Sequence, residues 1–82
     1  MTYLDKGKLE FIKAEVQQEL EAACQKFRPF ASGHEGYAII AEEVDELWDE
    51  VRKQYGLKRT AAMRKEAVQV AAMAMRFLYD VT

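Results

Sequence analysis

The segment from about residue 58 or 60 to residue 80 carries apolar side chains on nearly every side of a helix. Ala67, Ala71 and Leu78 lie on one side at helical spacing, and Val68 and Met75 lie on another. A helix that is apolar nearly all round must be buried nearly all round. The rest of an 82-residue chain is too small to enclose it, because domains of this size bury a limited core. We therefore expect a second copy of the chain to supply the missing cover.

Proline and glycine divide the chain into three helical segments, and no alternating apolar run of useful length predicts a strand. Helices are expected over residues 8–26, 33–55 and 58 or 60–80. Pro29 ends the first helix, and Gly56 is placed to cap the second. Ser32 and Glu35 form a capping-box pattern at the start of the second helix. We predict an all-α protomer of three helices in a single domain, residues 1–82.

Cys24 and His34 are each the only residue of their type, which excludes an intramolecular disulfide and a structural zinc site. We expect Cys24 to be buried beside the apolar stripe of the first helix, and His34 to be solvated near a helix start. The net charge of −2 favours neither nucleic acid nor a membrane surface as a partner. Without a membrane-length apolar run or a signal-peptide pattern, the protein is expected in the cytoplasm.

Acidic residues are concentrated in the second segment, because residues 35–50 contain seven Asp or Glu and no Lys or Arg. At 100° per residue, Glu43, Glu46 and Glu50 fall within about 60° of one another on one flank. Like charges at this spacing repel, so either solvent or a cation must relieve them. The apolar face of the same helix is expected in the core and comprises Tyr37, Ile40, Val44, Leu47, Trp48, Val51 and Tyr55.

Glu66 lies in the middle of an apolar stripe of the third segment. A buried carboxylate without a partner is costly, so it is expected to be paired, protonated or bound to a cation. A short connection between the last two helices favours an antiparallel pair, which brings Glu66 and Gln69 opposite Glu43 and Glu46. Oxygen ligands of this kind suit Mg²⁺ or Mn²⁺. The alternative for Glu66 is a salt bridge to an Arg of the neighbouring helix.

Two motifs, EEVDEL at residues 42–47 and EAVQ at residues 66–69, resemble those of the MazG-like, all-α nucleoside triphosphate pyrophosphohydrolases. The pattern of that family is a Glu-Glu-x-x-Glu-Leu helix followed by a Glu-x-x-Asp helix. The resemblance covers residues 30–81 and is strongest to the short, single-domain members of phages and bacteria. It implies a protomer that forms a homodimer or homotetramer with a four-helix-bundle-like site.

The resemblance also implies an activity, which is hydrolysis of a nucleoside triphosphate between its α and β phosphates. The products are the monophosphate and pyrophosphate, and the cofactor is Mg²⁺ or Mn²⁺. The metal would be held at positions matching Glu43, Glu46 and Glu66. Gln69 stands where the motif has Asp, and its amide oxygen can bind metal but cannot act as a base.

Further acidic and basic residues complete the site that the resemblance implies. Glu42 or Glu50 is expected to be the general base or an additional ligand. Basic residues around the connection between the two metal-bearing helices are the expected phosphate ligands, namely Lys53, Lys58, Arg59, Arg64 and Lys65. The alternative function is a catalytically degenerate helical homo-oligomer that binds nucleotide or a protein partner without turnover. A di-iron bundle is disfavoured, because it uses Glu-x-x-His pairs.

Overall fold

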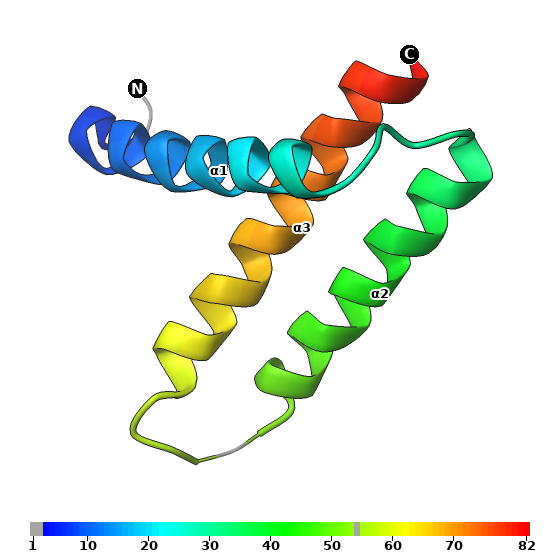
Figure 1. Ribbon diagram of the computed structural model, residues 1–82. Helices are drawn as coiled ribbons and strands as arrows, with labels where there is room; N and C mark the ends of the chain where they lie inside the picture. The colour runs from blue at the N-terminus through cyan, green and yellow to red at the C-terminus, as the bar shows by residue number, and fades with distance from the viewer. Residues whose placement is uncertain (1–2, 54) are drawn as a thin grey trace.

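The computed structural model describes residues 3–53 and 55–82, and these residues form three helices with no strand among them. The helices are α1 (Lys6–Lys26), α2 (Gly33–Val51) and α3 (Arg59–Val81). Helices α2 and α3 lie side by side and antiparallel, and α1 crosses α3 near its C-terminal half (Figure 1). The all-α prediction is therefore confirmed. None of the described helices is both long enough and apolar enough to cross a membrane.

Side chains and backbone groups around residue 30 fix the start of α2. The Ser32 hydroxyl accepts a hydrogen bond from the backbone N–H of Glu35 (3.1 Å), as the capping-box pattern predicts. The Glu35 carboxylate, however, accepts from the N–H of Ala31 (2.9 Å), outside the expected box. Arg28 explains the difference, because its guanidinium binds both carboxylate oxygens (3.0 and 2.8 Å) and draws the side chain toward residues 28–31.

The end of α2 comes earlier than the sequence predicts, at Val51 and not at Tyr55. The Arg59 guanidinium donates hydrogen bonds to the carbonyl oxygens of Val51 (2.7 Å) and Lys53. These bonds satisfy acceptors that a longer helix would have used. Gly56 lies beyond the helix end, and its φ of +145° suits glycine and few other residues. Gln54, which the predicted helix included, lies outside the described residues.

The core is small and lies where α1 and the segment after it meet α3. Its buried residues are Ala23, Phe30, Ala72 and Met73. The N–H of Phe30 donates to the Asp80 carboxylate (2.9 Å), which attaches the segment between α1 and α2 to the last turns of α3. The protomer thus buries little apolar area of its own.

Two predictions about burial are wrong for the protomer. Cys24 is exposed, because α1 presents the neighbouring Ala23 to the core. Tyr37 and Trp48 are 70% and 59% exposed, although the apolar pattern placed them in the core. Three further residues of the same expected face are exposed as well, namely Val44, Val51 and Tyr55. The reason is the orientation of α2. The face of the helix that contains the buried Gly36 packs toward α3, whereas the neighbouring face that carries Tyr37 and Trp48 remains exposed.

Gly36 is the point of closest approach between α2 and the other elements. A Cβ at this position would lie 2.7 Å from Cδ2 of Phe77 and 3.0 Å from Cδ2 of Phe30. We expect Gly36→Ala to lower the free energy of unfolding by about 1–3 kcal/mol, because overpacking outweighs the helix propensity gained. Chemical denaturation followed by circular dichroism at fixed protein concentration measures this change.

Gly33→Ala is the matched control for this substitution. A Cβ there would meet Cγ1 of Val81 at 3.8 Å and Cζ of Phe77 at 3.9 Å, which are ordinary contacts. We expect its stability to stay within about 0.5 kcal/mol of the wild type. Equal stability of the two variants would contradict the close packing at Gly36.

Candidate functional site

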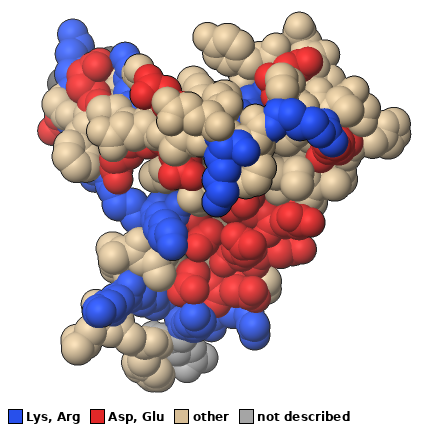
Figure 2. Space-filling view, viewed as in Figure 1, with Lys and Arg blue, Asp and Glu red and all other residues tan. Residues whose placement is uncertain are grey.

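Three carboxylates meet between α2 and α3. Glu43 and Glu46, one turn apart on α2, lie opposite Glu66 of α3, and one oxygen of each lies within 4.8 Å of the others. Acidic side chains gather in one patch over the α2–α3 pair, below α1 (Figure 2). The antiparallel pairing therefore brings together the three carboxylates that the sequence analysis nominated as metal ligands.

Burial and mutual repulsion disfavour the ionised forms of two of these carboxyls. Removal from water is the largest cause, followed by the negative charge of Glu46. Together with smaller effects of Glu66 and Glu42, they raise the pKa of Glu43 from 4.5 to about 7. The pKa of Glu66 is also raised, although the positive charge of Lys65 opposes the change.

The donor set fits a divalent cation that prefers oxygen ligands. Oxygens bound to one Mg²⁺ at about 2.1 Å lie at most about 4.2 Å apart, so small side-chain rotations bring the three carboxylates into range. The Oε2 atom of Glu43 is buried and has no hydrogen-bond partner. A cation would satisfy this atom and cancel the repulsion. The salt bridge to an Arg considered for Glu66 is not present among the described residues.

The remaining predicted ligands and bases lie in different surroundings. Glu50 is 22% exposed and pairs with Lys53, whose ammonium lies 3.0 Å from its carboxylate. Glu42 is exposed and immediately precedes Glu43 on α2. Gln69 is half-buried one turn after Glu66 and lines the same cavity as Glu42 and Glu43.

Three of the five basic residues proposed as phosphate ligands already bind other groups of the protein. Lys53 pairs with Glu50, Arg59 binds the carbonyls at the end of α2, and Arg64 binds both oxygens of Glu15 in α1. Lys58 and Lys65 are exposed and make no ion pair within the described ranges.

A cavity of about 650 Å³ adjoins the carboxylate cluster, and sequence reasoning missed its cations. Lys26, Arg28 and the buried Arg76 line it together with Glu43. Arg76 was detectable in principle, because it interrupts an apolar helix just as Glu66 does. A charged residue inside an apolar stripe is the signal that both residues share.

No family model, curated protein sequence or solved structure matches this chain. The resemblance to the MazG-like family thus remains a prediction carried by the motifs at residues 42–47 and 66–69.

The raised pKa of Glu43 predicts how metal-free stability depends on pH. The folded protein holds this proton more tightly than the unfolded chain, so its contribution is full below about pH 4.5 and is lost as pH rises through about 7. We expect Glu43→Gln to raise the free energy of unfolding at pH 8 by about 1–2 kcal/mol, allowing for solvent screening. The difference should vanish near pH 4.5.

Urea denaturation in the presence of a chelator, at several pH values, measures this effect. Asp45→Asn is the matched control, because it neutralises an exposed carboxylate on the same helix. If Glu43→Gln is no more stable than Asp45→Asn at pH 8, ionisation of Glu43 does not destabilise the folded protein, and the prediction is wrong.

Proposed function

We propose that the protein is a Mg²⁺-dependent nucleoside triphosphate pyrophosphohydrolase that converts a (d)NTP to the monophosphate and pyrophosphate; Mn²⁺ is the alternative metal. The observation that carries this proposal is the meeting of Glu43, Glu46 and Glu66 across two helices, with the buried Oε2 of Glu43 left without a partner. The order and spacing of the two acidic motifs support the same reading.

The residues divide into ligands and a candidate base. Glu43, Glu46 and Glu66 would hold the metal, which when bound neutralises phosphate charge and lowers the pKa of an attacking water. Glu42 is the better candidate for the base that accepts the proton of that water, because Glu50 is already paired with Lys53. Lys58, just before α3, and Lys65, within α3, make no ion pair with the described residues and are the better candidates to contact phosphate.

A purified sample tests the activity directly. We expect turnover of one or more dNTPs with Mg²⁺ or Mn²⁺, and anion-exchange chromatography should show monophosphate and pyrophosphate in equal amounts. Glu66→Gln should lower kcat/KM by about 100-fold or more, because it removes a charged ligand. Asp49→Asn is the control, since Asp49 pairs with Arg52 on the exposed side of α2. Release of orthophosphate from the wild type, or no turnover at all, would contradict the proposal.

Binding without turnover is the second candidate function, and Gln69 is the observation that favours it. An amide at this position carries no charge and accepts no proton at neutral pH. Calorimetric titration with Mg²⁺ and a non-hydrolysable triphosphate, combined with the turnover assay, distinguishes binding without turnover from hydrolysis. Tight binding combined with no turnover of any dNTP identifies the degenerate form.

We also propose that the chain forms a homodimer or homotetramer with a four-helix-bundle-like core. Tyr37, Val44, Trp48 and Val51 follow one line along α2, and all four are exposed. Val51 also lines an apolar groove of about 480 Å³ with Ile12 of α1. An exposed apolar surface of this kind suits a symmetric partner, and the small core of the protomer favours one.

Sedimentation velocity tests the assembly. We expect the wild type to sediment as a dimer or tetramer, and Trp48→Glu to shift it toward the monomer, because a buried charge would be unpaired in the interface. Ala38→Glu is the matched control, because it adds the same charge to an exposed position of α2 away from the stripe. A monomeric wild type, or equal behaviour of the two variants, would contradict the proposed interface.

A further inference from the structure

The cavity beside the carboxylates is lined by both acidic and basic side chains. Along α3 its wall runs from Gln69 to Arg76, which is roughly 10 Å of helix. Glu42 and Glu43 lie at the Gln69 end, since α2 is antiparallel. The volume of about 650 Å³ falls within the range of small-molecule sites, about 300–1,000 Å³.

Arg76 is a buried cation with no carboxylate within ion-pair distance among the described residues. The pKa of Glu35 is lowered chiefly by Arg28, with which that carboxylate is paired, and to a smaller extent by the charge of Arg76. Arg76 is 4% exposed, donates to the carbonyl oxygen of Arg28 (3.0 Å) and to Sδ of Met73 (3.5 Å), and lies 4.1 Å from the ring centre of Phe30. Its Nε has no hydrogen-bond partner, and no ion pair of the described residues includes it. Burial of such a charge is costly unless an anion compensates it.

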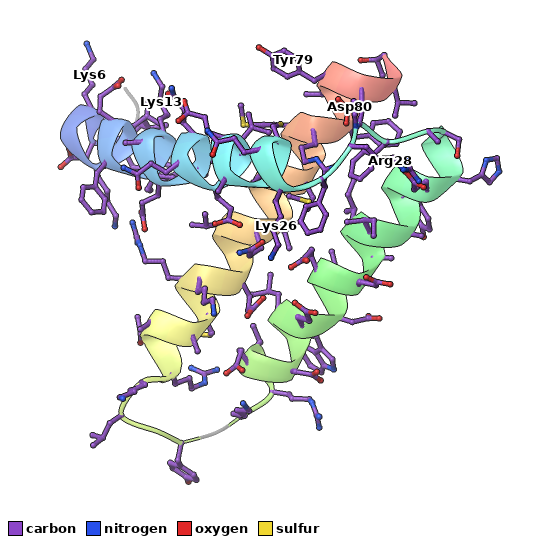
Figure 3. All side chains as sticks on the ribbon, viewed as in Figure 1. Lys6, Lys13, Lys26, Arg28, Tyr79 and Asp80 are labelled. Carbon is purple, nitrogen blue, oxygen red and sulfur yellow. The ribbon has the colours of Figure 1, made fainter. Side chains whose placement is uncertain are left out.

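Lys26 is a second cation at the same cavity. It comes from the last turn of α1, and Figure 3 shows it over the space between α2 and α3. Its ammonium lies 5.3 Å from the ring centre of Phe27, and it has no ion pair in the described part of the chain. Arg28 differs, because Glu35 neutralises it.

Two buried side-chain atoms without a hydrogen-bond partner also point to this cavity. Among the described residues they are Oε2 of Glu43 and Nε of Arg76, and both residues line this one cavity. Side chains on a helix lean toward its N-terminus, so Arg76 leans toward the end of the cavity where Glu43 lies. A carboxyl oxygen and a guanidinium nitrogen that both lack a hydrogen-bond partner thus border the same space.

We propose that this cavity receives the pyrophosphate end of the substrate, with Arg76 and Lys26 as its binding cations. The inference rests on the proposed function, because the carboxylate cluster would hold the metal at the other end of the cavity. Planar guanidinium and ammonium groups are the usual partners of phosphate oxygens. In hydrolysis between the α and β phosphates, water adds to the α phosphorus and the bond to the bridging oxygen breaks. The negative charge then develops on the departing pyrophosphate.

The aromatic residues of the wall favour an anion over a nucleobase as the occupant. Phe30 and Phe27 already lie under Arg76 and Lys26 as cation–π partners, so one face of each ring is occupied. Glu19 of α1 also lines the cavity. Its negative charge would repel free pyrophosphate more than a Mg²⁺–pyrophosphate complex, which carries less negative charge.

Isothermal titration with sodium pyrophosphate, first without and then with Mg²⁺, tests the inference. We expect Lys26→Gln and Arg76→Lys each to weaken pyrophosphate binding about tenfold or more. Lys26 is exposed, so Lys26→Gln should fold even if Arg76→Lys does not. Lys13→Gln is the matched control, because Lys13 lies on α1 on the side away from the α2–α3 pair (Figure 3) and pairs with Glu10.

Three outcomes would overturn the inference. The first is pyrophosphate binding that Lys26→Gln leaves unchanged. The second is an equal loss of binding in Lys13→Gln, which indicates a general effect of charge. The third is a dependence on Lys26 for binding of a nucleoside monophosphate but not of pyrophosphate, which assigns the cavity to the nucleoside end.

Mn²⁺ binding measured by electron paramagnetic resonance separates this inference from the proposed function. If Lys26→Gln binds Mn²⁺ and turns over dNTPs but binds pyrophosphate as tightly as the wild type, the cavity assignment alone fails. If the wild type neither binds Mn²⁺ nor turns over any dNTP, the proposed function fails. Binding of pyrophosphate that depends on Lys26 would then still identify an anion site.

Discussion

The antiparallel contact between α2 and α3 places carboxylates against one another where two amphipathic helices would normally bury apolar side chains. Desolvation and repulsion raise the pKa of Glu43 to about 7, so the contact opposes ionisation of its own residues. The close packing of Gly36 against Phe77 holds the helices together near the N-terminal end of α2. The repulsion is therefore confined to the middle of the pair, where a cation can relieve it.

The helix α3 connects the two halves of the protomer, because it packs on both α1 and α2. One part of its surface contributes Ala72 and Met73 to the core, and another contributes Glu66 to the carboxylate cluster. Asp80 and Arg76 bind backbone groups of the segment that leads into α2. Polar contacts thus fix the geometry around the cavity, while the apolar core remains small.

Periodicity and antiparallel pairing were sufficient to predict the three helices and the meeting of Glu43, Glu46 and Glu66. The same pattern could not predict which part of the apolar face of α2 is covered, because Trp48 and Leu47 differ by only one residue step. The end of α2 depends on Arg59, a residue from the next helix that binds its carbonyls. Such hydrogen bonds from a side chain of the next helix leave no periodic signal in a sequence.

The exposed stripe of α2 and the cation-lined cavity lie against different parts of the α2–α3 pair. Val51 of the stripe borders the apolar groove with Ile12, whereas the cavity lies near the end of α1 and contains Arg76. An oligomer that covers the stripe therefore leaves the cavity open. The proposed assembly and the proposed ligand binding would thus use separate surfaces, so Trp48→Glu should disrupt that assembly without removing a residue of the carboxylate cluster or of the cavity wall.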